Sequence, residues 1–308
     1  MTQSMTHTIL NIRDAAPGPG RVYVGRPSPL GNPYEVGRDG ERAVVIQKYA
    51  VWLDERLRER DPVVLTALLG IRPGDAMVCH CAPKRCHAEV IAQAVARTDW
   101  RPRPDETAPN RCYAGVGSRK TPPAILSLMT GVARRLAVHG YTLHSGGAPG
   151  ADLAFEQGAV AKTIFLPWHG FQSRPTAAHD IDQPSAEAFR VAALLHPGWD
   201  HLSQAAQKLM ARNTHQVLGA DLRSPVDFVV CWTPDGCETE AARRRTTGGT
   251  GQAIALANRW GIPVFNLYRV LTALDRLGVH ITRGLPTHLA TVEPTEEAST
   301  GIEGMSHG

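Results

Sequence analysis

The sequence predicts an α/β protein in which a domain built on a parallel β-sheet follows a smaller α/β domain. The chain of 308 residues is long enough for two domains, each with a buried core. A proline-rich segment at 99–110 separates two parts, and each part combines strand-like apolar segments with amphipathic, helix-like ones. In the second part the alternation is regular, which predicts parallel strands, covering helices and right-handed crossovers.

The first part is expected to hold two strands and three helices. Residues 1–20 end in a Pro/Gly run and are expected to form a loop. Residues 41–60 predict an amphipathic helix, because Val45, Tyr49 and Leu53 recur at helical spacing. The other expected elements are strands at 21–25 and 76–81 and helices at 62–69 and 87–98. The small α/β domain therefore spans 21–98, and residues 99–110 form a stiff linker.

The second domain is expected at 111–283, and its alternation of elements makes it Rossmann-like. Its expected strands are 112–115, 141–145, 163–167, 228–232 and 263–267. Its expected helices are 122–138, 152–161, 186–194, 203–218, 251–260 and 268–277. Residues 284–308 are polar and rich in Gly, Thr, Glu and Ser, which favours a loose tail.

Composition excludes several classes of protein. Hydrophobic residues make up 43% of the chain and charged residues 20%, which is ordinary for a globular protein. No apolar run is long enough to span a membrane, and the first residues lack the pattern of a signal peptide. We therefore expect a cytoplasmic protein with reduced cysteines. The net charge of +4 permits anionic ligands but does not argue for a surface that coats DNA.

Three glycine-rich segments, at 115–119, 145–152 and 247–252, follow predicted strands or open a predicted helix. In an open parallel sheet they lie at the carboxyl edge of the strands, where ligands bind. Glycine lets backbone N–H groups approach phosphate oxygens, and a helix N-terminus adds a favourable dipole. The segments predict a nucleotide-type phosphate ligand, and tight turns alone are the alternative. The predicted ligand-binding residues are Gly117, Ser118, Arg119, Ser145, Gly146, Gly147, Gly150, Gly248, Gly249, Thr250, Gly251 and Gln252.

These glycine segments resemble those of the SLOG superfamily, which includes the Rossmann domain of DNA-processing protein A and the Lonely-guy cytokinin phosphoribohydrolases. The resemblance extends over residues 111–278. It implies a nucleotide-derived ligand and N-glycosidic or phosphate-ester chemistry. Lonely-guy enzymes, however, carry a catalytic Glu after the third glycine segment. Here Gln252 follows Gly251, and glutamine cannot act as a general base.

Asp152 and Arg212 are the candidate catalytic residues. Asp152 could bind a ribose hydroxyl or act as an acid or base, and the alternative is a cap for the following helix. Arg119 and Arg212 are candidate phosphate clamps, because guanidinium matches phosphate bidentately. A solvated helix position is the alternative for Arg212. The arginine triplet at 243–245 is more typical of a solvated loop.

A cysteine- and histidine-rich segment at 79–87 ends a predicted strand and opens a predicted helix. Together with the motifs at 23–28 and 31–33, it resembles a small bacterial and phage domain family of unknown function. The resemblance implies that a shared pocket is formed by Arg26, Asn32, Cys81, Cys86 and His87.

This motif admits three interpretations. No metal is expected, because a regular strand would turn His80 away from Cys79 and Cys81, and no second cysteine pair precedes Cys112. An anion pocket is one alternative, in which the helix N-terminus lowers the pKa of Cys86. A buried thiol cluster is the other.

Three functions stay open at this point. The first is a nucleotide-processing enzyme, the second a non-catalytic sensor or sequestering protein for a nucleotide signal, and the third a single-stranded DNA-binding protein. The aromatic content of 6% weakens the third, because unpaired bases need stacking platforms. No cofactor other than the phosphate ligand is expected, no membrane partner is expected, and homo-oligomerisation is left open.

Overall fold

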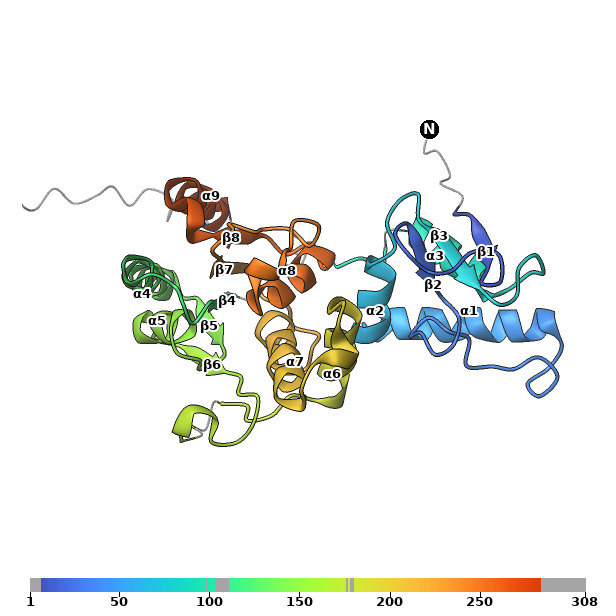
Figure 1. Cartoon of the computed structure of the whole chain (residues 1–308), viewed down its shortest axis with the longest axis horizontal. Coiled ribbons are helices and arrows are strands. Elements are labelled where there is room, and N and C mark those ends of the chain that lie inside the picture. Colours follow the sequence, from blue (N-terminus) through green and yellow to red (C-terminus); the bar gives the residue numbers. More distant parts are fainter. Residues whose placement is uncertain (1–6, 98, 103–110, 176, 178–179, 284–308) are drawn as a thin grey trace, which may run out of the picture.

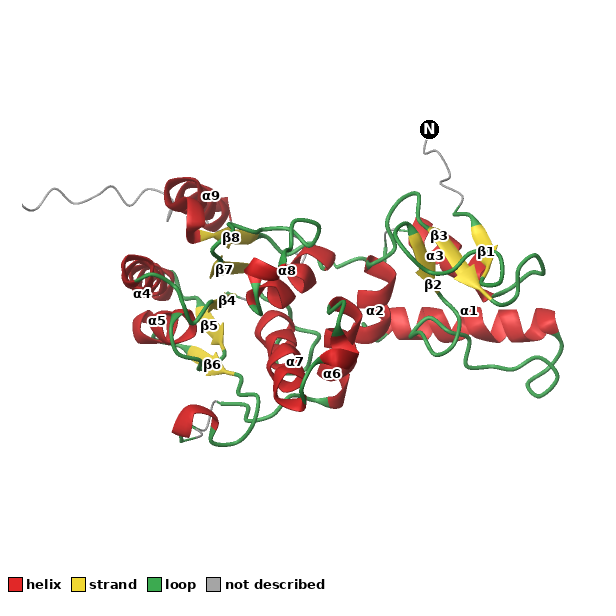
Figure 2. Ribbon diagram, viewed as in Figure 1, coloured by secondary structure: helices red, strands yellow, loops and turns green. Residues whose placement is uncertain are grey.

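The computed structural model describes residues 7–97, 99–102, 111–175, 177 and 180–283. It contains two parallel β-sheets, one in each of two α/β domains (Figures 1 and 2). The α/β class and the parallel, Rossmann-like second domain are thereby confirmed. Most of the predicted linker and the whole predicted tail lie outside the described residues.

The small domain has a three-stranded parallel sheet of order β1-β3-β2. Its strands are β1 (Ile9–Asn11), β2 (Arg21–Tyr23) and β3 (Ala76–Cys79), and its helices are α1 (Arg42–Arg58), α2 (Pro62–Leu69) and α3 (His87–Ala96). The expectation of a loop over 1–20 is wrong at β1. This strand has three half-buried residues, so only its pairing with the buried β3 identifies it.

Two local features explain the helices of the small domain. In α1, Val45, Tyr49 and Leu53 are buried at four-residue spacing, so one stripe of the helix faces the core. At the start of α2, the Asp61 carboxylate accepts from the N–H groups of Val63 and Val64. Pro62 occupies the first turn, where a missing N–H costs little. This helix therefore begins where the sequence predicted.

The second domain has a five-stranded parallel sheet of order β6-β5-β4-β7-β8. Its strands are β4 (Cys112–Gly117), β5 (Thr142–Ser145), β6 (Lys162–Ile164), β7 (Phe228–Trp232) and β8 (Val264–Asn266). Its α-helices are α4 (Pro123–Val138), α5 (Ala151–Gly158), α6 (Ala186–Leu195), α7 (Gln204–Leu218), α8 (Thr250–Arg259) and α9 (Val270–Arg283). Short 3₁₀ helices lie at η1 (Phe171–Ser173), η2 (Trp199–His201), η3 (Arg245–Thr247) and η4 (Leu267–Arg269).

Alternate residues of the strands face two helical layers. Tyr113, Phe228 and Val230 pack with α4, α5 and α9, whereas Ala114 and Val229 pack with α6, α7 and α8. Figure 1 shows these layers on opposite sides of the sheet. The chain runs from β4 outward to β6 and then returns to β7 on the other side of β4. The reversal of strand order therefore lies between β4 and β7, and ligands of such folds bind outside this point.

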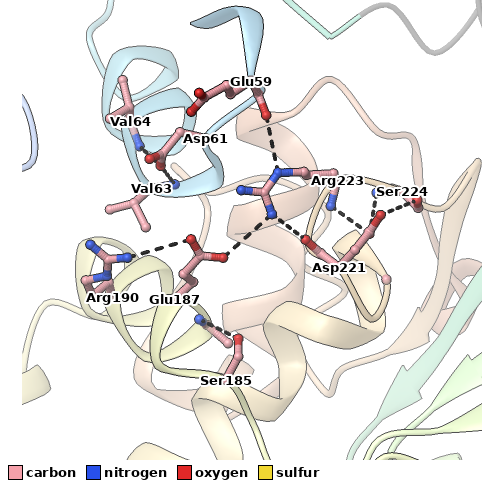
Figure 3. Close-up of polar contacts among 12 residues, drawn as sticks. Glu59, Asp61, Val63, Val64, Ser185, Glu187, Arg190, Asp221, Arg223 and Ser224 are labelled. Carbon is pink, nitrogen blue, oxygen red and sulfur yellow. Dashed lines mark hydrogen bonds and ion pairs between the residues drawn. The ribbon is translucent and has the colours of Figure 1, made fainter. Parts of the chain in front are cut away.

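The two domains contact each other through α2. The Trp260 indole N–H donates to the Thr66 hydroxyl at 3.0 Å, and both side chains are buried. Figure 3 shows Arg223 at the edge of this contact, where its Nε donates to the Glu59 carbonyl at 3.2 Å and its Nη1 lies 3.7 Å from Glu187. One continuous apolar core joins α2 to α6 and α8.

A search of the described helices for membrane-spanning candidates finds none with the required length and apolar character.

Candidate functional site

The first and second glycine segments meet at the carboxyl edge of the sheet. β4 ends at Gly117 and β5 ends at Ser145, and because the two strands are parallel their ends share one edge. The Ala151 N–H donates to the Ser118 carbonyl at 3.4 Å. Gly150 has φ +88°, and a Cβ there would lie 2.8 Å from the Ser118 oxygen. Glycine is therefore required at this contact.

A buried ion pair lies directly against the second segment. Arg212 of α7 is 6% exposed and Asp152 of α5 is 4% exposed, with Nη1 3.2 Å from Oδ2. A Cβ at Gly146 would overlap the Arg212 guanidinium, so the chain can pass only with glycine there. Burial raises the pKa of Asp152, which Arg212 opposes, and burial lowers the pKa of Arg212.

The placement of this pair excludes two simpler roles. Gly150, not Asp152, occupies the N-cap of α5, so the capping role considered for Asp152 is wrong. Arg212 is not a solvated helix residue, and its Nε has no hydrogen-bond partner among the described residues. The Arg212 guanidinium is thus held by Asp152 through Nη1 alone, with its Nε enclosed by the protein.

The third glycine segment returns to the same edge although it lies well beyond the end of β7. The Asp235 carboxylate accepts from the hydroxyls of Thr246 and Thr247, at 3.1 Å and 2.6 Å. The Asn213 side-chain amide donates to the Gly249 carbonyl at 3.1 Å. Asn213 follows Arg212 on α7, so two consecutive residues of this helix contact the second and third segments.

A pocket of about 520 Å³ opens beside the third segment. Arg243 is half-buried, donates to the Leu195 carbonyl at 3.0 Å and lies 3.6 Å from Glu240. Arg244 and Arg245 are exposed. The lining residues are His196, Pro197, Met210, Glu240, Arg243, Arg244, Arg245, Thr247, Gly248, Gly251 and Gln252. The arginine triplet, expected in a solvated loop, therefore lines a pocket, and its position shortly before the third glycine segment was the available signal.

The remaining predicted residues differ in what they can offer a ligand. Gln252 lines the pocket but is 3% exposed, and its amide donates to the Ala192 carbonyl at 2.9 Å. Thr250 is also buried. Arg119 is exposed at the end of the first segment. Its positive charge lowers the pKa of Asp152 and of Arg212. Gly147 has φ +65° and packs near Leu166 and Ile164, which assigns it to the turn itself.

The small domain contains a second pocket, of about 310 Å³. All five residues predicted to share a pocket line it, namely Arg26, Asn32, Cys81, Cys86 and His87. Gly25, Tyr34, Val36, Arg42, Val45, Ile46 and His80 complete the lining.

Several polar side chains in this second pocket already have protein partners. Arg26 lies 2.6 Å from Glu35, although both side chains are largely exposed. The His87 Nε2 lies 2.8 Å from the Val24 carbonyl, and its ring packs edge-on against Tyr49. These contacts fix the side chains that form the walls of the pocket. The groups at its base are cysteine thiols.

Three thiols converge at the base of the second pocket. The sulfur atoms of Cys79, Cys81 and Cys86 all lie within 4.8 Å of one another, and those of Cys79 and Cys86 are 3.4 Å apart. β3 ends at Cys79, so Cys81 lies in the following turn and not on a regular strand. The assumption of a regular strand over His80 and Cys81 is therefore wrong, although among the described residues His80 does not join the three thiols.

The expected low pKa of Cys86 is also wrong. The thiols of Cys79 and Cys86 share a hydrogen bond in which either sulfur can donate, and this bond together with burial raises the pKa of Cys86. The same hydrogen bond, with backbone N–H groups of residues 81 and 82, lowers the pKa of Cys79 to about 5. Thiolate character therefore belongs to Cys79, which lies behind the pocket wall.

Comparison with known proteins assigns a family to the small domain alone. Residues 11–97 match the family described as a domain of unknown function (DUF4326), so the similarity covers the small domain and not the chain as a whole. The matched range begins at the last residue of β1 and ends just after α3, so it contains the whole second pocket. No curated protein and no solved structure matches this chain.

Proposed function

We propose that the five-stranded domain binds a nucleotide-type ligand through its phosphate, at the carboxyl edge of the sheet beside β4 and β7. One observation carries the proposal: the second and third glycine segments, about a hundred residues apart in the chain, contact the consecutive residues Arg212 and Asn213 of α7, and the first segment contacts the second. Turn formation alone would not require them to meet at one edge. The resemblance of these segments to the SLOG superfamily supports the same conclusion.

The phosphate site is proposed at the start of α8. Gly249 is the N-cap of this ten-residue helix and provides no side-chain cap. The N–H groups of Gly251 and Gln252 already donate to the carbonyls of Gly248 and Gly249, so the N–H of Thr250 is the helix donor that is proposed to serve the phosphate. Arg244 and Arg245 line the adjoining pocket and add positive charge. Glu240 does not cancel this charge, because it lies 2.8 Å from Arg259.

The base and sugar are proposed to occupy the rest of the pocket. A volume of about 520 Å³ falls within the usual range for small-molecule sites. Met210 and Pro197 provide an apolar wall on which a base could lie, next to His196. These dimensions favour a mononucleotide-sized ligand over a polymer, since a single-stranded DNA site needs a basic groove with several aromatic platforms.

Binding without turnover is the function that the pocket favours. Glu240 is the one acid that lines the pocket among the described residues, and it is engaged by Arg259. Gln252 is held by Ala192. Cleavage of an N-glycosidic bond is the second candidate. It rests on Asp152, whose pKa is raised by burial, and it requires the ligand to extend beyond this pocket, which Asp152 does not line.

The experiment is calorimetric titration of the full chain with a panel of nucleoside mono-, di- and triphosphates. Gly249→Asp places a carboxylate at the proposed phosphate site, and we expect a loss of affinity of at least about tenfold. The fold should survive, because Gly249 has φ −62° and its new Cβ would meet only the flexible end of Met210. Gly249→Asn is the matched control, since it adds the same volume without the charge.

Two outcomes would count against the proposal. Equal loss of affinity in the Asp and Asn variants would assign the effect to volume and not to phosphate charge. Absence of binding by every nucleotide tested would remove the proposal altogether. Incubation of any bound nucleotide with the protein, followed by mass spectrometry for free base, separates binding from turnover.

A further inference from the structure

We propose that Cys79, Cys81 and Cys86 form an open three-thiolate site for a zinc-like divalent ion, with the fourth coordination position facing the second pocket. The inference concerns the small domain and does not depend on the nucleotide proposal. It follows from the position of three sulfur atoms, from the backbone that holds them and from the pocket they border.

The spacing of the sulfur atoms suits one ion. With a zinc–sulfur distance of about 2.3 Å, tetrahedral geometry separates two thiolate sulfurs by about 3.8 Å. The observed sulfurs are 3.4 Å apart for Cys79 and Cys86, and none of the three pairs exceeds 4.8 Å. Changes of at most about 1 Å in the sulfur–sulfur separations therefore suffice to place all three on one ion.

The backbone around the thiols is already ordered. The Cys81 N–H donates to the Cys79 sulfur at 3.4 Å, a type of contact that stabilises a metal-bound thiolate. The Asn11 side chain donates to the carbonyls of His80 and Ala82 and so holds the turn that carries Cys81. The Cys86 N–H donates to Glu89 at 3.2 Å. The ligands consequently come from three elements whose positions are set before metal binds.

The site is open on the side of the pocket. Within the described part of the chain no fourth Cys, His, Asp or Glu joins the group. His87 is turned to the Val24 carbonyl. Cys81 and Cys86 line the pocket whereas Cys79 lies behind them, so the vacant vertex of the tetrahedron points into the pocket.

The pocket also indicates what would occupy that vertex. Three thiolates and one divalent ion carry a net charge of −1, and Arg26 and Arg42 line the same pocket. Arg26 is already paired with Glu35, so the offset of this charge and the attraction for anions fall mainly to Arg42. A water molecule or an anionic oxygen donor is therefore the expected fourth ligand, as in zinc sites that keep one exchangeable position.

The test uses the full chain, purified under reducing conditions, stripped of metal and titrated with Co²⁺ and then Zn²⁺. We expect one equivalent of Co²⁺ to give thiolate-to-cobalt charge-transfer absorbance, and Zn²⁺ to displace it. Cys81→Ser should lower the affinity at least about tenfold and the absorbance by about one third, because one of three thiolates is lost. Cys81 is partly exposed, so this variant should keep its fold by circular dichroism.

Cys112→Ser is the matched control, since Cys112 is also partly exposed but lies in the other domain. It should leave both affinity and absorbance unchanged. Azide added to the cobalt form should shift the ligand-field bands if the fourth position is open. Metal binding unchanged in Cys81→Ser, or absence of charge-transfer absorbance in the wild type, would overturn the site. Ligand-field bands indifferent to azide would overturn its open position.

Discussion

The two candidate sites are built in opposite ways. One is the glycine edge of the five-stranded domain, where the three glycine segments lie, and the other is the second pocket, or thiol pocket, of the three-stranded domain. At the glycine edge the backbone segments pack closely on one another, and the ion pair of Asp152 and Arg212 is buried against the second segment. In the thiol pocket, side chains from three elements point to one place. The first site depends on the absence of Cβ atoms and the second on the presence of sulfur.

This difference predicts different sensitivities to mutation. A site formed by the backbone should lose affinity when a substitution adds volume or charge to it. A site formed by side chains should lose affinity when a substitution removes one ligand atom. The two domains share one continuous apolar core through α2. A substitution in one domain can therefore lower the stability of both, whereas its effect on binding should be confined to its own site. The following predictions test that contrast.

The largest effect on stability is expected at the buried ion pair. Arg212→Met should lower the free energy of unfolding by about 3–5 kcal/mol, because it leaves the Asp152 carboxylate buried without its partner. The difference in the free energy of unfolding between the variant and the wild type should become smaller as the pH falls, because Asp152 then takes up a proton. Urea denaturation at neutral and acid pH measures both effects. Addition of Asp152→Asn should recover part of the loss, and a double variant no more stable than Arg212→Met would contradict this.

A smaller effect is expected from acid pH. Burial lowers the pKa of His144 from 6.5 to about 4, and burial also lowers the pKa of His215. Between those pH values the unfolded chain binds more protons than the folded one, so the stabilisation present above pH 6.5 is lost as the pH falls toward 4. His144 alone should contribute about 3 kcal/mol across this window.

Hydrogen exchange at pH 7 and pH 5 locates the effect. Exchange in β5, which carries His144, should accelerate at the lower pH more than exchange in β3, after correction for the intrinsic rates. His144→Gln should flatten the pH dependence, and replacement of the exposed His201 by Gln should not. Equal acceleration in both sheets would indicate that the domains open as one unit.

A third prediction concerns the contact between the domains. Thr66→Val removes the acceptor of the Trp260 indole N–H and should cost about 1–3 kcal/mol, because that donor is then buried without a partner. Thermal unfolding followed by calorimetry measures the loss. Nucleotide and metal affinities should not change, and a change in either would show that the domain contact controls a site.

The smallest effect is expected at the rim of the thiol pocket. Glu35→Gln removes the partner of Arg26, but both side chains are largely exposed, so stability should change by less than about 1 kcal/mol. Thermal denaturation at low and high salt checks this. A larger loss, insensitive to salt, would mean that the pair holds the pocket wall in place.

Several features of the fold follow from local sequence pattern. The bounds of α2 and β7 agree with their predicted ranges, because Asp61 caps the helix and an apolar run without polar interruption forms a fully buried inner strand. Other ends differ by a few residues, as at β3, which stops at Cys79 and leaves Cys81 in a turn. A local pattern does not reveal where strand pairing ends.

The sequence by itself determined the alternation of strands and helices, the glycine segments at strand ends and the set of five residues that line the thiol pocket. Each of these depends on residues close together in the chain or on a motif that carries its own geometry. Only the tertiary structure decided that β1 pairs with β3, that three thiols converge and that Gln252 turns to Ala192. It also decided that Arg212 is buried against Asp152, sixty residues away along the chain. A side chain's environment is set by the elements packed against it, and contacts so distant in sequence leave no periodic signal.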